Sequence, residues 1–249
     1  MGALVWQRAI VVGGSSGIGE AVARRLAGAG CRVALVARRE AELARVRDAI
    51  VTAGGRADVH VHDVTRTDDV GRTFAAACAA LGGLDLVVYA AGIMPRIRPD
   101  EYTFASDAAV VDVNLLGAMA WLNEAAVRFA AAGAGTIVGI SSVAGDRGRR
   151  GYPAYNASKA ALDTYLESLR NRLARRGVAV VTVKPGPVDT PMSRGIPRRP
   201  LLIDADTAAR RILAVAGRRS RVAYVPATWR PIMFVIRNLP GWLFQRLDI

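Results

Sequence analysis

A tyrosine and a lysine stand four residues apart in the stretch "SSVAGDRGRRGYPAYNASKAAL", which covers residues 141–162. This spacing puts Tyr155 and Lys159 on one face of a helix, so their polar ends can reach a common site. A phenol with a pKa of about 10 is a weak acid or base at neutral pH, and lowering that pKa by about three units requires roughly 4 kcal/mol of preferential stabilisation of the phenolate. A nearby ammonium contributes to that stabilisation, and a serine hydroxyl could hydrogen-bond a substrate oxygen. The pattern therefore indicates acid–base chemistry at an oxygen atom.

A glycine-rich turn lies near the N-terminus, in "GGSSGIGEAVARRL". Gly13, Gly17 and Gly19 follow an apolar run and directly precede an amphipathic helical pattern. Glycines permit a tight turn and a close backbone approach, and the free N–H groups at a helix start favour a pyrophosphate. We expect a dinucleotide here; the alternative is an ordinary strand-to-helix turn.

Two arginines follow the next apolar run, in "VALVARREAEL". An NAD-binding protein places an acid in this neighbourhood, on the ribose 2′-hydroxyl. Arg38 and Arg39 can instead pair with a 2′-phosphate, which predicts NADP(H), and Glu40 falls one position too late for the ribose. The alternative is that two surface arginines simply begin a helix.

The third apolar run ends in "HVHDVT", where Asp63 and Val64 could border an adenine pocket. His60 and His62 point to one face of this strand. No third ligand stands nearby, so we expect ordinary strand side chains and no metal site.

Short β-branched runs alternate with alanine-rich helical stretches along the chain. Strands are expected near residues 9–12, 32–36, 58–61, 84–89, 135–140, 179–183 and 221–225, and helices near 17–29, 40–53, 68–81, 106–131, 155–175 and 206–216. This order predicts an α/β protein with a doubly wound, mostly seven-stranded parallel sheet, a three-layer αβα fold of the Rossmann type. A chain of 249 residues without a linker fits one domain over residues 1–249.

The composition restricts the class of protein further. The formal net charge is +13, and all but two of the 34 basic residues are arginines. They are scattered and no zinc-ligand pattern accompanies them, so a solvated basic surface is expected and nucleic-acid binding is not. Cys31 and Cys78 are far apart, which suggests buried thiols in a reducing compartment. No signal-peptide pattern or run of 18 apolar residues occurs, so a cytoplasmic protein is expected.

These motifs together resemble those of short-chain dehydrogenases/reductases, from the glycine turn to at least Met192. Tyr155 and Lys159 match the family's Tyr-x₃-Lys, and Ser142, thirteen positions before the tyrosine, matches its catalytic serine. Asn114 in "VDVNLLGAM" matches the asparagine that supports a proton-relay water, and "KPGPVDTPM" matches the segment that holds the nicotinamide carboxamide. The residues that the turn, the arginines and the resemblance place at the cofactor are Gly13, Ser15, Ser16, Gly17, Ile18, Gly19, Arg38, Arg39, Asp63, Val64, Ala91, Gly92, Tyr155, Lys159, Pro185, Gly186, Val188 and Thr190.

The resemblance also implies a mechanism. Tyr155 would donate a proton to a carbonyl oxygen while hydride passes from NADPH to its carbon. Lys159 would hold the nicotinamide ribose and depress the pKa of the tyrosine. Ser142 would orient the carbonyl, and Asn114 would link the lysine to solvent through water.

The chain departs from the family pattern at two positions. Val12 stands where the family has a threonine, and Ala90, in "YAAG", stands where it has an asparagine. These losses remove polar supports around the cofactor pocket but leave the reacting groups untouched. They motivate a second hypothesis, a catalytically quiet NADP-binding regulator or scaffold, beside the first, an NADPH-dependent carbonyl reductase.

The substrate end differs from that of many family members. Residues 193–206 stand where the family keeps a mobile substrate loop, although a fixed surface loop is an equal alternative. Residues 226–249 form an apolar tail with interspersed arginines, expected to make short amphipathic helices broken at Pro240. The tail could pack on a partner subunit of a homodimer or homotetramer, roof the substrate site, or lie on an anionic membrane surface. It favours a hydrophobic, lipid- or steroid-like ketone, aldehyde or alcohol as substrate.

Overall fold

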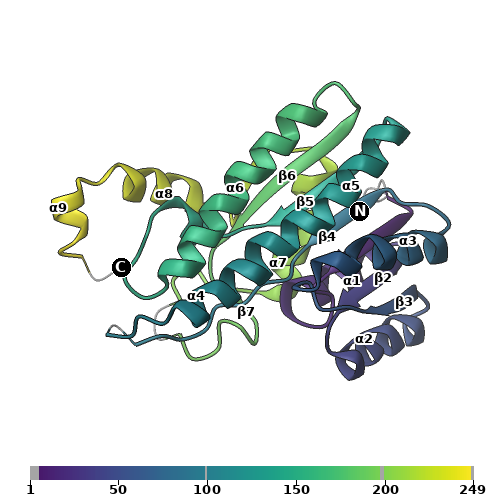
Figure 1. The fold of residues 1–249 in the computed structure, drawn as a ribbon, viewed down its shortest axis with the longest axis horizontal. Helices are drawn as coiled ribbons and strands as arrows, with labels where there is room; N and C mark the ends of the chain where they lie inside the picture. Colours follow the sequence, from purple (N-terminus) through teal and green to yellow (C-terminus); the bar gives the residue numbers. More distant parts are fainter. Residues whose placement is uncertain (1–5, 99, 197–198, 248–249) are drawn as a thin grey trace.

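Seven parallel strands form the central sheet of the computed structural model, which describes residues 6–98, 100–196 and 199–247. The strand order is β3-β2-β1-β4-β5-β6-β9. The strands are β1 (Arg8–Val12), β2 (Arg32–Ala37), β3 (Arg56–Val61), β4 (Leu86–Tyr89), β5 (Gly135–Ile140), β6 (Val178–Pro185) and β9 (Val222–Val225). Parallel neighbours require crossover connections, and helices supply them (Figure 1). The predicted doubly wound, seven-stranded parallel sheet is confirmed.

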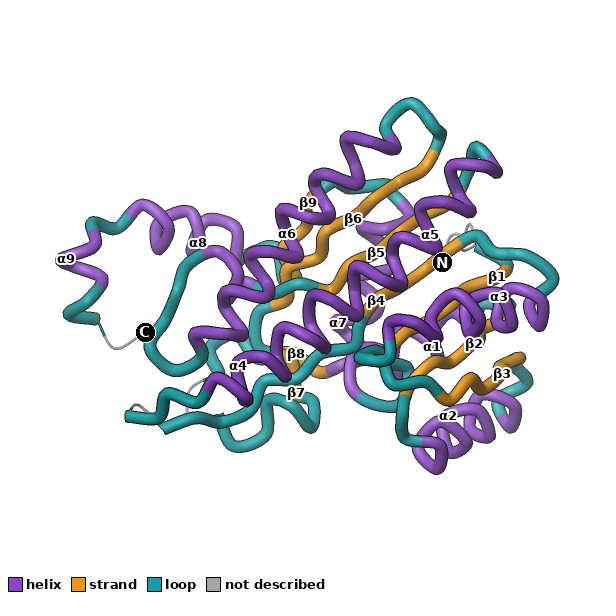
Figure 2. Tube along the Cα trace, in the orientation of Figure 1, coloured by secondary structure: helices purple, strands orange, loops and turns teal. Residues whose placement is uncertain are grey.

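Helices cover both faces of this sheet, and the tube view in Figure 2 separates them from the strands. They are α1 (Gly17–Gly28), α2 (Glu40–Thr52), α3 (Val70–Leu81), α4 (Phe104–Val111), α5 (Gly117–Ala132), α6 (Pro153–Leu173), α7 (Ala205–Gly217), α8 (Trp229–Asn238) and α9 (Gly241–Phe244). Alternate residues of β1 illustrate the layering, because Ala9 and Val11 belong to the core under α1, α2 and α7, whereas Ile10 and Val12 belong to the core under α3, α5 and α6. The three layers of the prediction are therefore present.

The helix predicted near 106–131 contains a feature that its sequence pattern did not predict. It begins earlier, at Phe104, and a π-helical turn, η2 (Asp112–Leu116), joins α4 to α5. Such turns insert one residue into the helix and often occur at functional positions. Here the turn carries Asn114, whose side chain is fully buried.

The same helical stretch, Phe104–Ala132, is long and apolar enough to cross a membrane by length and composition alone. Its inner side contributes Trp121 and Phe129 to the core under the sheet. Burial of that side accounts for the apolar composition as that of a core helix.

The sheet reverses its winding between β1 and β4, which are direct neighbours. In such sheets ligands bind beyond the carboxyl ends of the strands at this switch point. The loops that follow β1, β4, β5 and β6 all emerge at that edge because their strands run parallel.

Two short strands frame the predicted substrate loop. β7 (Val188–Asp189) pairs in parallel with β8 (Ile203–Asp204), and α7 begins at Ala205. The last part of the segment 193–206 is therefore regular structure fixed to the end of β6. Within 193–202, Pro197 and Arg198 lie outside the described residues.

Candidate active site

The glycine turn between β1 and α1 has no room for a side chain at Gly13 or Gly19. Gly13 has φ +88° and Gly17 has φ +57°, in the left-handed region that favours glycine. A Cβ atom on Gly19 would lie 2.2 Å from the carbonyl oxygen of Gly13, and one on Gly13 would lie 2.5 Å from the backbone nitrogen of Ala91. The spacing of the three glycines is therefore required for β1, α1 and the loop after β4 to approach one another.

This turn forms one wall of a cavity of about 690 Å³ at the switch point. The predicted cofactor residues among its lining are Gly13, Ser15, Ser16, Gly17, Ile18, Gly19, Arg38, Arg39, Asp63, Val64, Ala91, Gly92 and Thr190. The predicted residues outside that lining are Asn114, Ser142, Tyr155, Lys159, Pro185, Gly186 and Val188. The cavity therefore brings together the expected phosphate, ribose and adenine groups, with the acid–base residues behind its wall.

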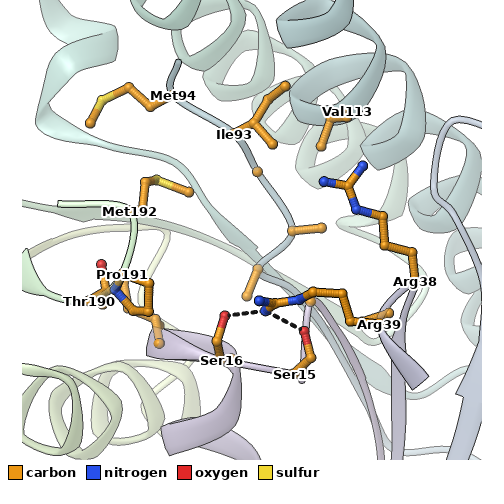
Figure 3. Close-up of a pocket in the computed structure, with 18 of the residues that line it drawn as sticks. Ser15, Ser16, Arg38, Arg39, Ile93, Met94, Val113, Thr190, Pro191 and Met192 are labelled. Atoms are coloured by element: carbon orange, nitrogen blue, oxygen red, sulfur yellow. Dashed lines mark hydrogen bonds between the residues drawn. The ribbon is translucent and has the colours of Figure 1, made fainter. Parts of the chain in front are cut away.

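Sequence reasoning did not name several residues that complete the lining. They are Ala37, His62, Ala90, Ile93, Met94, Pro95, Arg96, Val113, Pro191, Met192 and Arg194. Most of them directly follow β4 or β7, and position relative to the strand ends is the signal that could have identified them. Figure 3 shows Met94 and Met192 at the end of the cavity away from Arg38 and Arg39, and the lining also contains Pro95 and the charged residues Arg96 and Arg194.

The two arginines after β2 lie in the cavity but point to different groups. Arg39 donates from Nη2 to the hydroxyl oxygens of Ser15, at 2.9 Å, and Ser16, at 2.8 Å (Figure 3). Arg38 is 63% exposed, and its Nη1 lies 3.9 Å from the carboxylate of Asp63. One guanidinium is thus held beside the glycine turn and the other, weakly paired, faces solvent. Both arginines line the same side of the cavity.

The end of β3 contributes a carboxylate and a histidine. Asp63 accepts hydrogen bonds from the backbone nitrogen of Thr65, at 3.1 Å, and from its hydroxyl, at 2.9 Å. Burial works to raise the pKa of Asp63, but the bonds from Thr65 and the charge of Arg38 outweigh it, so the pKa is lowered. His62 is buried against Trp121, and burial lowers its pKa. No group of three potential metal ligands occurs in the described parts of the chain.

Lys159 and Asn114 meet behind the cavity wall at Gly92. A Cβ atom on Gly92 would lie 3.2 Å from Asn114 Oδ1 and 3.6 Å from Lys159 Nζ. Asn114 accepts from the backbone nitrogen of Ile93 at 2.8 Å and donates to its carbonyl at 3.0 Å and to Ser158 Oγ at 3.1 Å. The π turn therefore holds the loop after β4 through the hydrogen bonds of Asn114. Because Gly92 has no side chain, Lys159 Nζ lies close to the cavity wall.

Lys159 itself is buried and donates from Nζ to the carbonyl of Ile140 at 2.9 Å. Burial lowers its pKa to about 8, with the charge of Asp163 acting in the opposite direction. Its Nζ lies 5.7 Å from the centroid of the Tyr155 ring. The ammonium is thus near the phenol but is directed to the backbone of β5.

The pKa of Tyr155 is shifted in the opposite direction to the one expected from the sequence. Its pKa is raised, because burial outweighs hydrogen bonding with Ser142 and the positive charge of Arg149. Lysine was expected to depress this pKa, and in this structure the effects that lower it come from Ser142 and Arg149. Tyr155 borders a small hollow lined also by Pro95, which itself lines the large cavity. Tyr155 is therefore separated from the cavity lining by Pro95, which borders both spaces.

Ser142 starts the short 3₁₀ helix η3 (Val143–Asp146), and its hydroxyl accepts from the backbone nitrogen of Ala144 at 3.0 Å. The neighbouring Ser141 donates from its hydroxyl to the carbonyl of Lys159 at 3.2 Å. Ser141 therefore ties the segment between β5 and η3 to α6.

A buried cluster of charged side chains links η3 to β6 and α6. Lys184 on β6 pairs with Asp146 at the end of η3 and, at 2.9 Å, with Asp163 on α6. Tyr224 on β9 donates to the second carboxylate oxygen of Asp146 at 2.7 Å. Burial raises the pKa of Asp163 against the attraction of Lys184, and the two carboxylates keep the pKa of Lys184 raised in spite of its own burial. The cluster holds together the segments that carry Ser142, Lys159 and the expected carboxamide loop.

The carboxamide segment lies at the carboxyl end of β6, and its residues are divided between core and cavity. Thr190 lines the cavity, while Val188 is buried in the core. A Cβ atom on Gly186 would lie 2.0 Å from the indole nitrogen of Trp229, so glycine is needed for α8 to pack there. Ser193 donates to the carbonyl of Val188 at 2.6 Å and accepts from the backbone nitrogen of Thr190 at 3.2 Å. These bonds fix the turn that presents Thr190.

The departures at Val12 and Ala90 leave the pairing of β1 and β4 intact. The backbone nitrogen of Ala90 donates to the carbonyl of Val12 at 2.8 Å, so the two strands stay joined at the cavity edge. The Cβ atom of Ala90 stands 3.4 Å from the position that a Cβ on Gly19 would take. A small side chain at this position therefore suits the tight glycine turn.

The fold and the cavity define an α/β protein of the dinucleotide-binding class. The family model described as "short chain dehydrogenase" matches residues 7–200. An uncharacterized oxidoreductase of Myxococcus xanthus is 38% identical over 186 residues, covering 75% of this chain and 74% of the relative. An uncharacterized oxidoreductase of Mycobacterium tuberculosis is 32% identical, with 96% of each chain covered.

Solved structures agree. A short-chain type dehydrogenase/reductase from Mycobacterium ulcerans superposes with a TM-score of 0.78 and 28% identity, covering 88% of each chain. The chain belongs to the short-chain dehydrogenase/reductase family of oxidoreductases, which use the nicotinamide cofactors NAD(P)(H).

Proposed function

We propose that this protein is an NADP(H)-dependent oxidoreductase that interconverts a ketone or aldehyde and the matching alcohol. The observation that carries the proposal is the approach of Lys159 and Asn114 to Gly92, which brings the acid–base residues to the wall of a dinucleotide-sized cavity. The turn, which has no room for a side chain at its first and third glycines, and the open floor of the cavity fit a pyrophosphate. The guanidinium of Arg39 beside Ser15 and Ser16 supports a 2′-phosphate, and thus NADP(H) over NAD(H).

Each residue of the proposed site would have a separate role in the reaction. The dinucleotide would supply or accept the hydride. Tyr155 would give its hydroxyl proton to the carbonyl oxygen of the substrate or take it back from the alcohol, and Ser142 would hydrogen-bond that oxygen. Lys159 would hold the ribose next to the nicotinamide, and its ammonium would favour the phenolate. Asn114 would connect the lysine to solvent through water.

Met94, Pro95 and Met192 support a substrate with a hydrophobic part, of lipid or steroid character, and Arg96 and Arg194 line the same cavity. Within the described residues, the cavity lining contains no residue of the tail 226–247. The described residues of the tail therefore do not roof this cavity.

The direct test is a panel of ketones and aldehydes with NADPH and with NADH, following the loss of reduced-nicotinamide absorbance. We expect turnover of apolar carbonyl compounds with NADPH and a much lower kcat/KM with NADH. Equal or better use of NADH would contradict the NADP(H) assignment. Tight binding of NADPH with no turnover of any carbonyl compound would favour the alternative, a catalytically quiet NADP-binding regulator.

We further expect a cytoplasmic homodimer or homotetramer built from a single domain of residues 1–249. The family is generally oligomeric and acts on small molecules, which supports this expectation. Light scattering of the purified protein measures the assembly directly, and a monomeric mass would contradict it.

A further inference from the structure

The C-terminal helices α8 and α9 carry an apolar outer face, here called the tail face and defined as Ile232, Phe234, Val235 and Trp242. Phe234 is 71% exposed, Val235 59% and Trp242 63%. Figure 1 shows α8 and α9 extending beyond the body of the molecule, at the end away from α2. Large apolar side chains gathered at a projecting end indicate a surface that contacts another apolar phase.

The inner side of the same helices is already anchored, so the tail face is not needed to hold them in place. Trp229 and Met233 are buried in a small core with Val143 of η3. Arg147 donates from Nη1 to the carbonyls of Ile236, at 2.7 Å, and Leu239, at 2.6 Å. The helices therefore present the tail face on a fixed base.

Positive charge flanks the tail face and exceeds the negative charge of its own segment. Residues 226–249 include three arginines, Arg230, Arg237 and Arg246, and one acidic residue, Asp248. The guanidinium carbon of Arg246 lies 5.7 Å from the centre of the Trp242 ring. Apolar side chains bordered by arginines and an interfacial tryptophan are typical of helices that lie in a lipid headgroup layer.

The positive charge distinguishes between two possible partners of the tail face, a second copy of the chain and a membrane surface. A contact with a second copy through this face would bring together two arginine-bearing segments, on chains that each carry a net charge of +13. An anionic bilayer offers the opposite charge together with an apolar interior. We propose that the tail face docks on an anionic membrane surface, with Phe234, Val235 and Trp242 inserted at the headgroup boundary and the arginines on lipid phosphates.

This position would bring the substrate end of the cavity close to the lipid. α8 packs on η3, directly after Ser142, and Trp229 lies on Gly186 beside the expected carboxamide segment. A lipid-soluble carbonyl compound would then have a short path to the site. The docking proposal itself does not depend on the proposed reaction.

The test is binding of the full chain to vesicles of phosphatidylcholine alone and of phosphatidylcholine with about a third phosphatidylglycerol. We expect cosedimentation with the anionic vesicles and much weaker binding to the neutral ones. Trp6, Trp121 and Trp229 are buried, so Trp242 is the exposed one of the four tryptophans and its emission should shift to the blue on binding. Absence of binding to anionic vesicles would overturn the proposal.

Two double variants separate the contributions. Phe234→Ser with Trp242→Ser should abolish the binding, and Arg230→Gln with Arg237→Gln should weaken it about 30-fold, since each arginine near an anionic surface contributes about 1 kcal/mol. Val51→Ser and Arg56→Gln remove the same kinds of exposed group at the far end of the molecule and should leave vesicle binding unchanged. Circular dichroism and NADPH binding check that all variants are folded.

Two outcomes would contradict the docking model. If the tail-face variants bind anionic vesicles as tightly as the parent chain does, the attraction is due to overall charge. If they instead lower the mass in light scattering and leave vesicle binding unchanged, the face is a contact between subunits.

Discussion

At the scale of single residues, Lys159 is the proposed acid–base residue whose pKa lies nearest to neutral pH. Its Nζ is buried, hydrogen-bonded to a backbone carbonyl and close to the cavity wall at Gly92. Burial lowers its pKa to about 8, while the pKa of Tyr155 is raised. The free protein therefore keeps both groups protonated at neutral pH, which suits proton donation to a carbonyl.

The lysine leads to a prediction about stability and pH. The unfolded pKa of a lysine is about 10.4, and the folded pKa of Lys159 is about 8. Between these values the unfolded chain binds more protons, so this lysine makes the free energy of unfolding rise with pH, by roughly 3 kcal/mol in all. Urea denaturation of the parent and of Lys159→Met should show that difference between about pH 8 and pH 10. Parallel curves for the two proteins would contradict the buried, depressed lysine.

Arg39 leads to a prediction about cofactor choice. Its guanidinium is held by Ser15 and Ser16 beside the glycine turn. Loss of a charged hydrogen bond to a phosphate costs about 1.5–3 kcal/mol, so Arg39→Gln should raise the KM for NADPH roughly 10- to 150-fold and leave the KM for NADH nearly unchanged. Arg45→Gln is the control, because Arg45 pairs with Glu20 outside the cavity lining. An equal loss with both cofactors would mean that Arg39 supports the turn and does not select the phosphate.

At the scale of elements, the site depends on how η3, α6 and β6 are held together. Lys184 lies between Asp146 and Asp163, and all three side chains are largely buried. A Cβ atom on Gly145 would lie 2.9 Å from the carbonyl carbon of Lys159, which shows how closely η3 packs on α6. The ionic cluster thus fixes the distance between the serine and the tyrosine–lysine helix.

Breaking this cluster should cost stability. Lys184→Met leaves two buried carboxylates without their cation, which should lower the free energy of unfolding by about 3–5 kcal/mol in urea denaturation. Adding Asp146→Asn and Asp163→Asn to that variant should recover much of the loss. Arg72→Met, which breaks the exposed pair with Asp69, is the control and should cost less than about 1 kcal/mol. A similarly small cost for Lys184→Met would show that the cluster is not a determinant of stability.

The elements also show how far the sequence predicts the structure. Short β-branched runs and helical periodicity predicted the parallel sheet and most helix positions, because a strand that is buried on both faces is apolar along its whole length. The π turn at Asn114 and the two-residue strands β7 and β8 carry no such periodicity, since contacts with Ile93 and between distant loops fix them. The ionic cluster was missed for the same reason, because its members are separated along the chain.

At the scale of the whole molecule, the parallel sheet brings the loops after β1, β4, β5 and β6 to one edge, where the cavity and the acid–base residues lie. The glycine turn, the two arginines and the residues after β3 line the cavity, whereas Asn114, Tyr155 and Lys159 come from helical segments and lie outside its lining. The motifs did not predict that Tyr155 borders its own hollow or that the substrate end is lined by Met94 and Met192, since those positions depend on loop conformation. At one end of the molecule, α8 and α9 carry the exposed apolar side chains of the tail face together with arginines.

The central claim is that proton transfer in an NADP(H)-dependent reaction runs through Tyr155. The most direct test is single-turnover reduction of an active carbonyl substrate by NADPH in the parent and in Tyr155→Phe. We expect the rate to fall by about 10²–10⁴ while the affinity for NADPH, followed by fluorescence, stays the same. A Tyr155→Phe protein that binds NADPH and reduces the substrate at the parent rate would contradict the account.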